Sequence, residues 1–287
     1  MSSFSLDWLR LRAPFDAAAR SRPLLQRFAQ NLPRPVRLID LGAGTGATLR
    51  ALAPTIGGEQ SWVLIDNDAA LLDALALEMS CCGWVSTPVT DGMAFSNARC
   101  HVQIVPHQAD LAGEIEHLDL AGIDAVVGSA LLDLVSEGWS GRLAQRCAAF
   151  GVPLYMALSF DGRLSWSPGD SRDDLLRQAF LEHQHRDKGF GPALGPDATR
   201  VTAGELERLG FDVTLAESDW HIGPQDMAMH RALLAGLQDA ACEQAPQFQD
   251  DIEAWAASRR RQIEAGTLST IVGHQDLLAY PPPFSRA

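Results

Sequence analysis

Basic side chains are scarce in this sequence of 287 residues, and lysine is nearly absent. Lys188 is the single lysine beside 22 arginines, and 36 acidic residues bring the formal net charge to −13. Proteins that hold nucleic acid through its phosphates usually present a basic patch, and anionic membranes also select basic surfaces. The composition therefore argues against a nucleic-acid partner and against a membrane partner.

Cysteine pairs and long apolar runs are lacking as well. None of the five cysteines forms a C-x-x-C pair, which favours reduced thiols over a disulfide framework or a metal site. No run approaches the roughly 18 apolar residues of a membrane-spanning helix. The first residues do not show the pattern of a signal peptide. We therefore expect a cytoplasmic protein, and no histidine–carboxylate spacing predicts a metal site.

Short apolar runs alternate with helical patterns over the first half of the sequence. The predicted strands are residues 36–40, 62–66, 101–106, 123–128 and 152–158. Strands that alternate with helices indicate crossover connections and a parallel sheet. Later strand candidates lie near 212–218 and 269–279, and helical patterns cover 226–243 and 247–265. After the fifth predicted strand, FDGRLSWSP predicts a hairpin or an irregular arm with its turn at Asp161–Gly162.

The most informative segment is LIDLGAGTGA, residues 38–47, a strand followed by Gly-x-Gly-x-Gly and a helix. Glycines allow a sharp turn and a close approach of the backbone to a ligand. Asp66 ends the next predicted strand, 20 residues beyond Gly46. A carboxylate at that place can accept both ribose hydroxyls of a bound nucleoside. The segment therefore predicts a nucleotide-type site at the carboxyl edge of the sheet.

Two cofactors fit this loop. Gly42, Gly44 and Ala47 also match the dinucleotide fingerprint, so a NAD(P)-dependent oxidoreductase is an alternative. Asp40, two residues before the first glycine, suits a ligand with a cationic group better than a pyrophosphate. Asp110 follows the third strand and can accept an adenine amino proton. Carboxylates at three strand ends favour S-adenosyl-L-methionine, although a cofactor-binding partner protein without turnover is a third alternative.

Residues 36–160 resemble the class I S-adenosylmethionine-dependent methyltransferases. The resemblance lies in four blocks: LIDLGAGTG (38–46), WVLIDND (62–68), HQADL (107–111) and IDAVVGSALLDLV (123–135). It implies an α/β fold with a Rossmann-like, doubly wound sheet of seven strands, mostly parallel, with the last one antiparallel. On this basis residues 36–287 form the methyltransferase domain with helical insertions at 160–200 and 226–265. Residues 1–35 form an N-terminal helical cap.

The resemblance also implies residue roles. The glycine loop passes under the methionine part, Asp66 binds the ribose, Asp110 and Leu111 meet the adenine, and the segment after strand four borders the methyl group. Arg12 or Arg20 could pair with the methionine carboxylate, and Arg20 enters the predicted site. The full predicted cofactor site is Arg20, Asp40, Gly42, Ala43, Gly44, Gly46, Asp66, Asn67, Asp110, Leu111, Ser129 and Ala130.

Methyl transfer from a sulfonium is a direct displacement, so the protein mainly aligns the nucleophile. A general base helps when the acceptor carries a proton, and the predicted catalytic residues are His183, Lys188 and His274. Strand four is followed by SALLDLV and not by the Pro-Pro-aromatic pattern of the nucleic-acid amino-methyltransferases. The sequence therefore favours a small-molecule or protein acceptor, with a small molecule as the leading hypothesis, and it predicts neither the acceptor's identity nor the oligomeric state.

Overall fold

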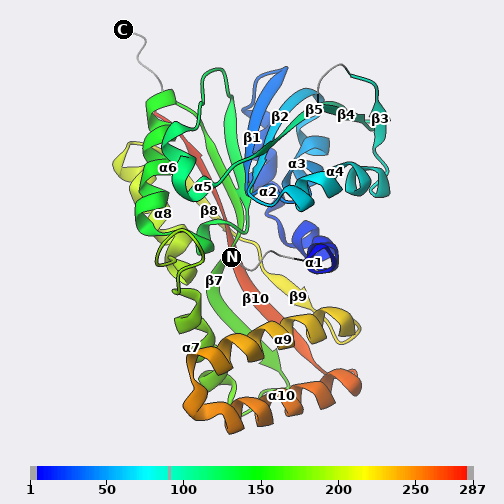
Figure 1. The fold of residues 1–287 in the computed structure, drawn as a ribbon, viewed down its shortest axis with the longest axis vertical. Helices are drawn as coiled ribbons and strands as arrows, with labels where there is room; N and C mark the ends of the chain where they lie inside the picture. The colour runs from blue at the N-terminus through cyan, green and yellow to red at the C-terminus, as the bar shows by residue number, and fades with distance from the viewer. Residues whose placement is uncertain (1–4, 90–91, 283–287) are drawn as a thin grey trace.

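The computed structural model describes residues 5–89 and 92–282, which build one sheet with helices on both faces (Figure 1). The strand order is β3-β4-β5-β2-β1-β6-β7-β10-β8, and β9 pairs with β10. The strands are β1 (Val36–Leu41), β2 (Gly58–Asp66), β3 (Val85–Thr87), β4 (Met93–Ser96), β5 (Cys100–Gln108), β6 (Ala125–Ser129), β7 (Leu154–Ser167), β8 (Asp212–Glu217), β9 (Trp220–Ile222) and β10 (Ser269–Tyr280).

All seven predicted strands are confirmed, and so is the fold class. Strands β5, β2, β1, β6 and β7 run parallel, while β10 is antiparallel to both β7 and β8. The chain adds three strands that were not predicted. They are short, with four residues or fewer each, so the alternation of apolar and polar residues is too brief to identify them.

Two helical layers cover the sheet, as Figure 1 shows. On one face, α2, α3 and α4 bury leucines and Phe28 against the strands. On the other face, α6 and α8 bury Trp139, Leu143 and Leu206. The helices are α1 (Leu6–Ala19), α2 (Arg22–Gln30), α3 (Ala47–Ile56), α4 (Ala69–Cys81), α5 (Leu111–Glu114), α6 (Glu137–Phe150), α7 (Asp173–Gln184), α8 (Ala198–Arg208), α9 (Met227–Gln244) and α10 (Gln249–Glu264).

The predicted hairpin at Asp161–Gly162 is wrong, because β7 continues through both residues to Ser167. Gly162 keeps a positive φ of 88°, but it lies opposite an irregular part of the ladder around Gly273 of β10 and not in a turn. A glycine inside a strand often marks such an irregularity. The long strands β7 and β10 therefore run on together past the ends of β1 and β6.

A third core forms on this extension of the sheet. Apolar residues of α7, α9 and α10 pack against β7, β9 and β10, and Figure 1 shows these helices beyond the carboxyl ends of the central strands. Helix α1 packs against β9 and α9. The carboxyl edge of the central strands thus lies between the central sheet and the third core. None of the helices in the described residues is long and apolar enough to cross a membrane.

Candidate functional site

The glycine loop between β1 and α3 is shaped by backbone conformations that favour glycine. Gly42, Gly44 and Gly46 have φ values of 65°, 51° and 77°. A Cβ atom on Gly46 would lie 2.5 Å from Leu75 Cδ1, whereas one on Gly44 would lie 3.8 Å from Leu9 Cδ1 of α1. The loop therefore packs tightly against Leu75 of α4 at Gly46 and is covered by α1 at Gly44.

Asp40 ends β1 beneath this loop and is completely buried. Neither carboxylate oxygen has a hydrogen-bond partner. Burial raises the pKa of Asp40 to about 8, although the positive charge of Arg20 and the nearby Thr48 hydroxyl act in the opposite direction. A buried carboxylate without a partner is a group that a cationic ligand would stabilise.

Arg20 directly follows α1, and its guanidinium is also buried. Its Nη2 donates to Ser129 Oγ over 2.7 Å, while Nε and Nη1 have no partner. Ser129 Oγ lies 3.0 Å from Thr48 Oγ1. Within the described residues no ion pair of 4.0 Å or less joins Arg20 to Asp40. A buried carboxyl group and a buried guanidinium, both with unused polar atoms, therefore flank one end of the glycine loop.

Asp66 and Asp110 lie at the ends of the neighbouring strands β2 and β5. Asp66 accepts hydrogen bonds from the backbone N–H groups of Gly44, over 2.7 Å, and Asp68, over 2.9 Å, one on each carboxylate oxygen. Each oxygen keeps a second lone pair. Asp110 is exposed and caps α5 through Ala112 N–H. The three predicted carboxylates thus follow three strands at one edge of the sheet.

The remaining predicted cofactor residues border the same edge. Ala43 is buried, and its N–H donates to the carbonyl of Ile65 over 3.0 Å. The Asn67 carbonyl accepts from Gln108 Nε2 over 3.2 Å. The carbonyl of the buried Leu111 accepts from Trp139 Nε1 over 2.7 Å. These contacts fix the backbone of Ala43, Asn67 and Leu111 at this edge of the sheet.

Ala130 has a left-handed backbone conformation, with a φ of 51°, and Leu158 of the neighbouring strand has a φ of 57°. Such values are uncommon outside glycine and are found preferentially at functional sites. The Ala130 N–H donates to the carbonyl of Ala157 over 2.9 Å. The chain after β6 is therefore bent sharply next to Ser129, at the place where the resemblance puts the methyl group.

The three predicted catalytic residues occupy two places. His183 Nδ1 lies 3.5 Å from Lys188 Nζ, and His183 Nε2 lies 3.2 Å from Glu243 Oε2. His274 is separate and buried, with its ring 4.7 Å from that of Trp220. No hydrogen bond or ion pair in the described part of the chain joins His274 to the other two.

His274 is neutral at physiological pH. Burial, with a further contribution from the positive charge of Arg12, lowers its pKa to about 3. Its Nδ1 lies 3.0 Å from the Val272 carbonyl oxygen, which assigns the ring hydrogen to Nδ1 because a carbonyl only accepts. The Nε2 atom is then the unprotonated nitrogen. Burial also lowers the pKa values of His183 and Lys188.

Asp133 is a candidate that the sequence interpretation missed. It lies in the short 3-10 helix Leu132–Leu134, three residues after Ala130, and its Oδ1 is buried without a hydrogen-bond partner. The available signal was one acidic residue inside the apolar run LLDLV. A single acid in such a run is often a solvated turn residue, so only the tertiary structure shows that Asp133 is half-buried with a fully buried Oδ1.

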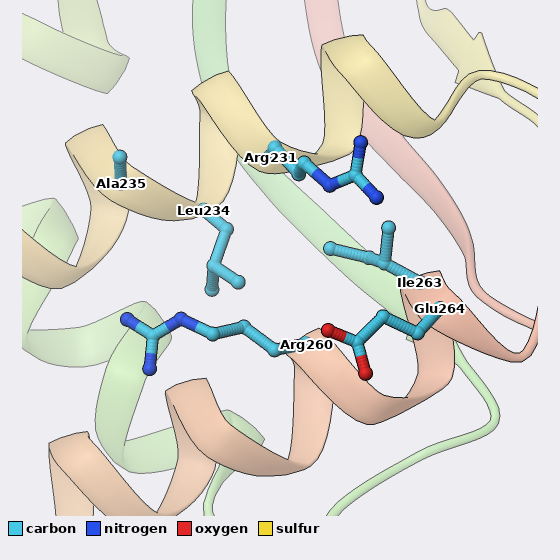
Figure 2. Close-up of a pocket in the computed structure, with 6 residues that line it drawn as sticks. All are labelled: Arg231, Leu234, Ala235, Arg260, Ile263 and Glu264. Carbon is cyan, nitrogen blue, oxygen red and sulfur yellow. The ribbon is translucent and has the colours of Figure 1, made fainter.

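A hollow of about 200 Å³ lies elsewhere, between α9 and α10. Figure 2 shows Arg231, Arg260 and Glu264 around it, with Leu234 and Ile263 at its base. These helices belong to the third core, far along the chain and the fold from the glycine loop (Figure 1). The hollow is therefore separate from the site at the carboxyl edge.

Comparison with known proteins finds similarity in structure alone. No protein-family model and no curated protein matches the sequence. Phosphoethanolamine N-methyltransferase 2 of Haemonchus contortus, in complex with S-adenosyl-L-methionine, is 11% identical with a TM-score of 0.47, covering 99% of this chain and 58% of that one.

Two other solved structures share the same outline. A SAM-dependent methyltransferase from Geobacter sulfurreducens, in complex with S-adenosyl-L-homocysteine, is 15% identical with a TM-score of 0.45 and covers 98% of this chain and 100% of that one. A cyclopropane synthase from Mycobacterium tuberculosis is 14% identical with a TM-score of 0.46, covering 97% and 87%. Similarity this low says nothing about the activity of this chain.

Proposed function

We propose that this protein is an S-adenosylmethionine-dependent methyltransferase with a small-molecule acceptor. The observation that carries the proposal is the pair of buried, incompletely bonded ionisable side chains Asp40 and Arg20 beside the glycine loop. The amino-acid end of S-adenosylmethionine carries an ammonium and a carboxylate, and it would satisfy both. A dinucleotide would instead bring a pyrophosphate towards Asp40, where like charges repel.

The other predicted residues complete the cofactor site in this proposal. Asp66 uses its remaining lone pairs for the ribose hydroxyls, and Asp110 with Leu111 borders the adenine. Ser129 and Ala130 lie beside the methyl position. When bound, the cofactor supplies a methyl group already activated on a sulfonium. The chain's own contribution is to bind, to orient the acceptor and to exclude water.

His183, Lys188 and His274 remain acceptor-side candidates. His274 offers an unprotonated Nε2 at physiological pH, but its low pKa makes it a weak base. Lys188 and His183 hold each other between the end of α7 and α9. We therefore assign these three residues to acceptor binding and not to proton transfer.

The proposal is tested by ligand binding. S-adenosyl-L-homocysteine should raise the melting temperature, and NAD⁺ should not. Arg20→Gln should weaken S-adenosyl-L-homocysteine binding roughly 10- to 100-fold, since a charge-assisted hydrogen bond contributes about 1.5–3 kcal/mol. Arg22→Gln, two residues along and exposed, is the matched control. Stabilisation by NAD⁺ alone, or equal affinity in the wild type and Arg20→Gln, would refute the proposal.

A further inference from the structure

We infer that Asp133 accepts the proton of the acceptor's nucleophile and that Lys188 faces it across the acceptor site. The substrate class that follows is a small molecule with a neutral hydroxyl or amine as nucleophile. This inference rests on the proposed methyl transfer, and it adds a catalytic carboxylate that the cofactor site does not contain.

Asp133 lies on a chain segment that crosses the glycine loop. The segment from Ser129 to Asp133 leaves β6 at the carboxyl edge of the sheet, and a Cβ atom on Gly42 would lie 3.4 Å from Leu131 Cδ1. The segment therefore runs over the glycine loop, immediately beyond the residues that border the methyl position. A side chain on this segment is close enough in the fold to act on a nucleophile placed there.

One carboxylate oxygen of Asp133 is buried without a hydrogen-bond donor. Its Oδ1 has no hydrogen-bond partner and no contact with solvent. Burial raises its pKa to about 6, opposed by the backbone N–H groups of Asp133 and Phe160 and by the charges of Arg12 and Lys188. A buried acceptor atom without a donor is rare in folded proteins. A bound hydroxyl or amine would supply the donor.

Lys188 supplies the charge opposite to that of the Asp133 carboxylate. No ion pair of 4.0 Å or less joins Lys188 to Asp133 in the described residues, although each influences the other's pKa. Lys188 is held by His183, and His183 by Glu243. Arg12 is occupied by Asp16, at 2.9 and 3.2 Å. The segment that carries Lys188 packs against the segment of Asp133, since the Leu194 N–H donates to the Val135 carbonyl over 2.7 Å.

In the proposed reaction, proton transfer to Asp133 accompanies methyl transfer. The acceptor's O–H or N–H bond breaks, and its proton goes to the Asp133 carboxylate. The oxygen or nitrogen lone pair forms a bond to the methyl carbon, and the carbon–sulfur bond breaks with its electron pair on sulfur. Positive charge leaves the sulfonium as a proton reaches Asp133, so no oxidant or metal is consumed.

The same geometry disfavours an anionic nucleophile. A carboxylate acceptor would meet the Asp133 carboxylate at close range in a buried place, where like charges cannot both remain ionised. A neutral hydroxyl or amine can donate to Asp133 and accept from Lys188 at once. The pair therefore selects nucleophiles that carry a proton.

The first experiment tests whether Asp133 and Lys188 share one site. Reductive methylation with ¹³C-formaldehyde labels Lys188 as the only lysine, and the α-amine gives a distinct resonance. Asp133→Asn should lower the pKa of the labelled Lys188 by about half a unit or more, because a negative neighbour is removed. Asp197→Asn is the control, since Asp197 is exposed and paired with Arg200. An unchanged Lys188 titration in Asp133→Asn would overturn the arrangement.

The second experiment measures turnover with defined probes. Small alcohols, phenols, amines and carboxylates are offered with S-adenosyl-L-methionine, and S-adenosyl-L-homocysteine release is followed. We expect turnover only with the hydroxyl or amine members. Asp133→Asn should reduce it by about 10²- to 10⁴-fold and leave the Kd for S-adenosyl-L-homocysteine within twofold of wild type.

Three results would overturn the inference: wild-type turnover in Asp133→Asn, turnover confined to carboxylates, or an inert panel with a protein that binds S-adenosyl-L-homocysteine. A protein that fails to bind S-adenosyl-L-homocysteine would instead refute the proposed function, so the two failures are distinguishable. Asp197→Asn again serves as the control and should keep wild-type turnover.

Discussion

Asp40 is fully buried without a hydrogen-bond partner, so its ionised form opposes folding of the ligand-free protein. Burial raises its folded-state pKa to about 8 from an ordinary value of 3.8. Below the lower value both states are protonated. Between the two values the unfolded chain loses its proton while the native protein keeps it, so stability falls as pH rises through this window.

Asp40→Asn removes this titration and keeps the shape of the side chain. We expect the variant to melt at a higher temperature than the wild type at pH 8, with the difference shrinking towards pH 4. It should also bind S-adenosyl-L-homocysteine more weakly. Gains in stability with losses in function are typical of functional sites. Scanning calorimetry from pH 4 to 8 checks this, and a pH-independent difference would contradict it.

The exposed Asp239 of α9 provides the control for that experiment. Asp239→Asn removes one carboxylate from the surface. Its melting temperature should follow that of the wild type at every pH.

At the scale of secondary-structure elements, Asp276 of β10 joins the N-terminal helices to the sheet. Its carboxylate is completely buried and accepts hydrogen bonds from Ser21 N–H (2.9 Å), Tyr155 O–H (3.2 Å) and Leu158 N–H (2.9 Å). Ser21 lies between α1 and α2. This contact therefore fixes the junction from which Arg20 reaches the site.

Asp276→Ala should lower the free energy of unfolding by about 3 kcal/mol, because three buried donors lose their acceptor. Hydrogen exchange should also become faster in α1, since its anchor is lost. Asp212→Ala is the matched control. Asp212 also joins α2 to the sheet, through Arg27 at 2.7 Å, but its side chain is 68% exposed, and surface pairs contribute little. Equal effects of the two variants on urea unfolding would contradict the prediction.

At the scale of the whole molecule, β7 and β10 pass through both ends of the fold (Figure 1). Because β7 and β10 belong to both the central sheet and the third core, unfolding of one of these two regions should expose the other. Arg259 is a sensitive probe of the far end, since it is buried between Trp166 and Trp255, at 5.4 and 5.5 Å from the ring centres. It forms an ion pair with Asp173.

Arg259→Ala should destabilise the protein by about 3–5 kcal/mol, because Asp173 would lose its buried partner. We expect one cooperative transition at a lower temperature, with tryptophan fluorescence and far-ultraviolet circular dichroism coinciding. Two separated transitions would show that the far end unfolds independently. Arg261→Ala, on the exposed side of the same helix, should leave the melting temperature nearly unchanged.

The sequence predicted the central strands and the glycine loop because their signals are local. Buried parallel strands are continuous apolar runs, and only glycine adopts the positive φ values of Gly42, Gly44 and Gly46 without strain. The extension of β7 could not be predicted in this way. Its partner β10 is more than 100 residues away in the chain, so the turn signal at Asp161–Gly162 outweighed the true pairing.

The residues around Lys188 show the same difference between what local sequence predicts and what the tertiary structure decides. By itself, the sequence determined that His183 lies on a helix, that the lone lysine follows this helix in a glycine-rich segment, and that Asp40 and Asp66 end two strands. Only the tertiary structure decided that Arg20 and Asp40 are both buried with unused polar atoms, and that Asp133 Oδ1 is buried without a partner. The reason is physical: local patterns set backbone conformation, whereas burial and charge pairing depend on which distant elements the folded sheet brings together.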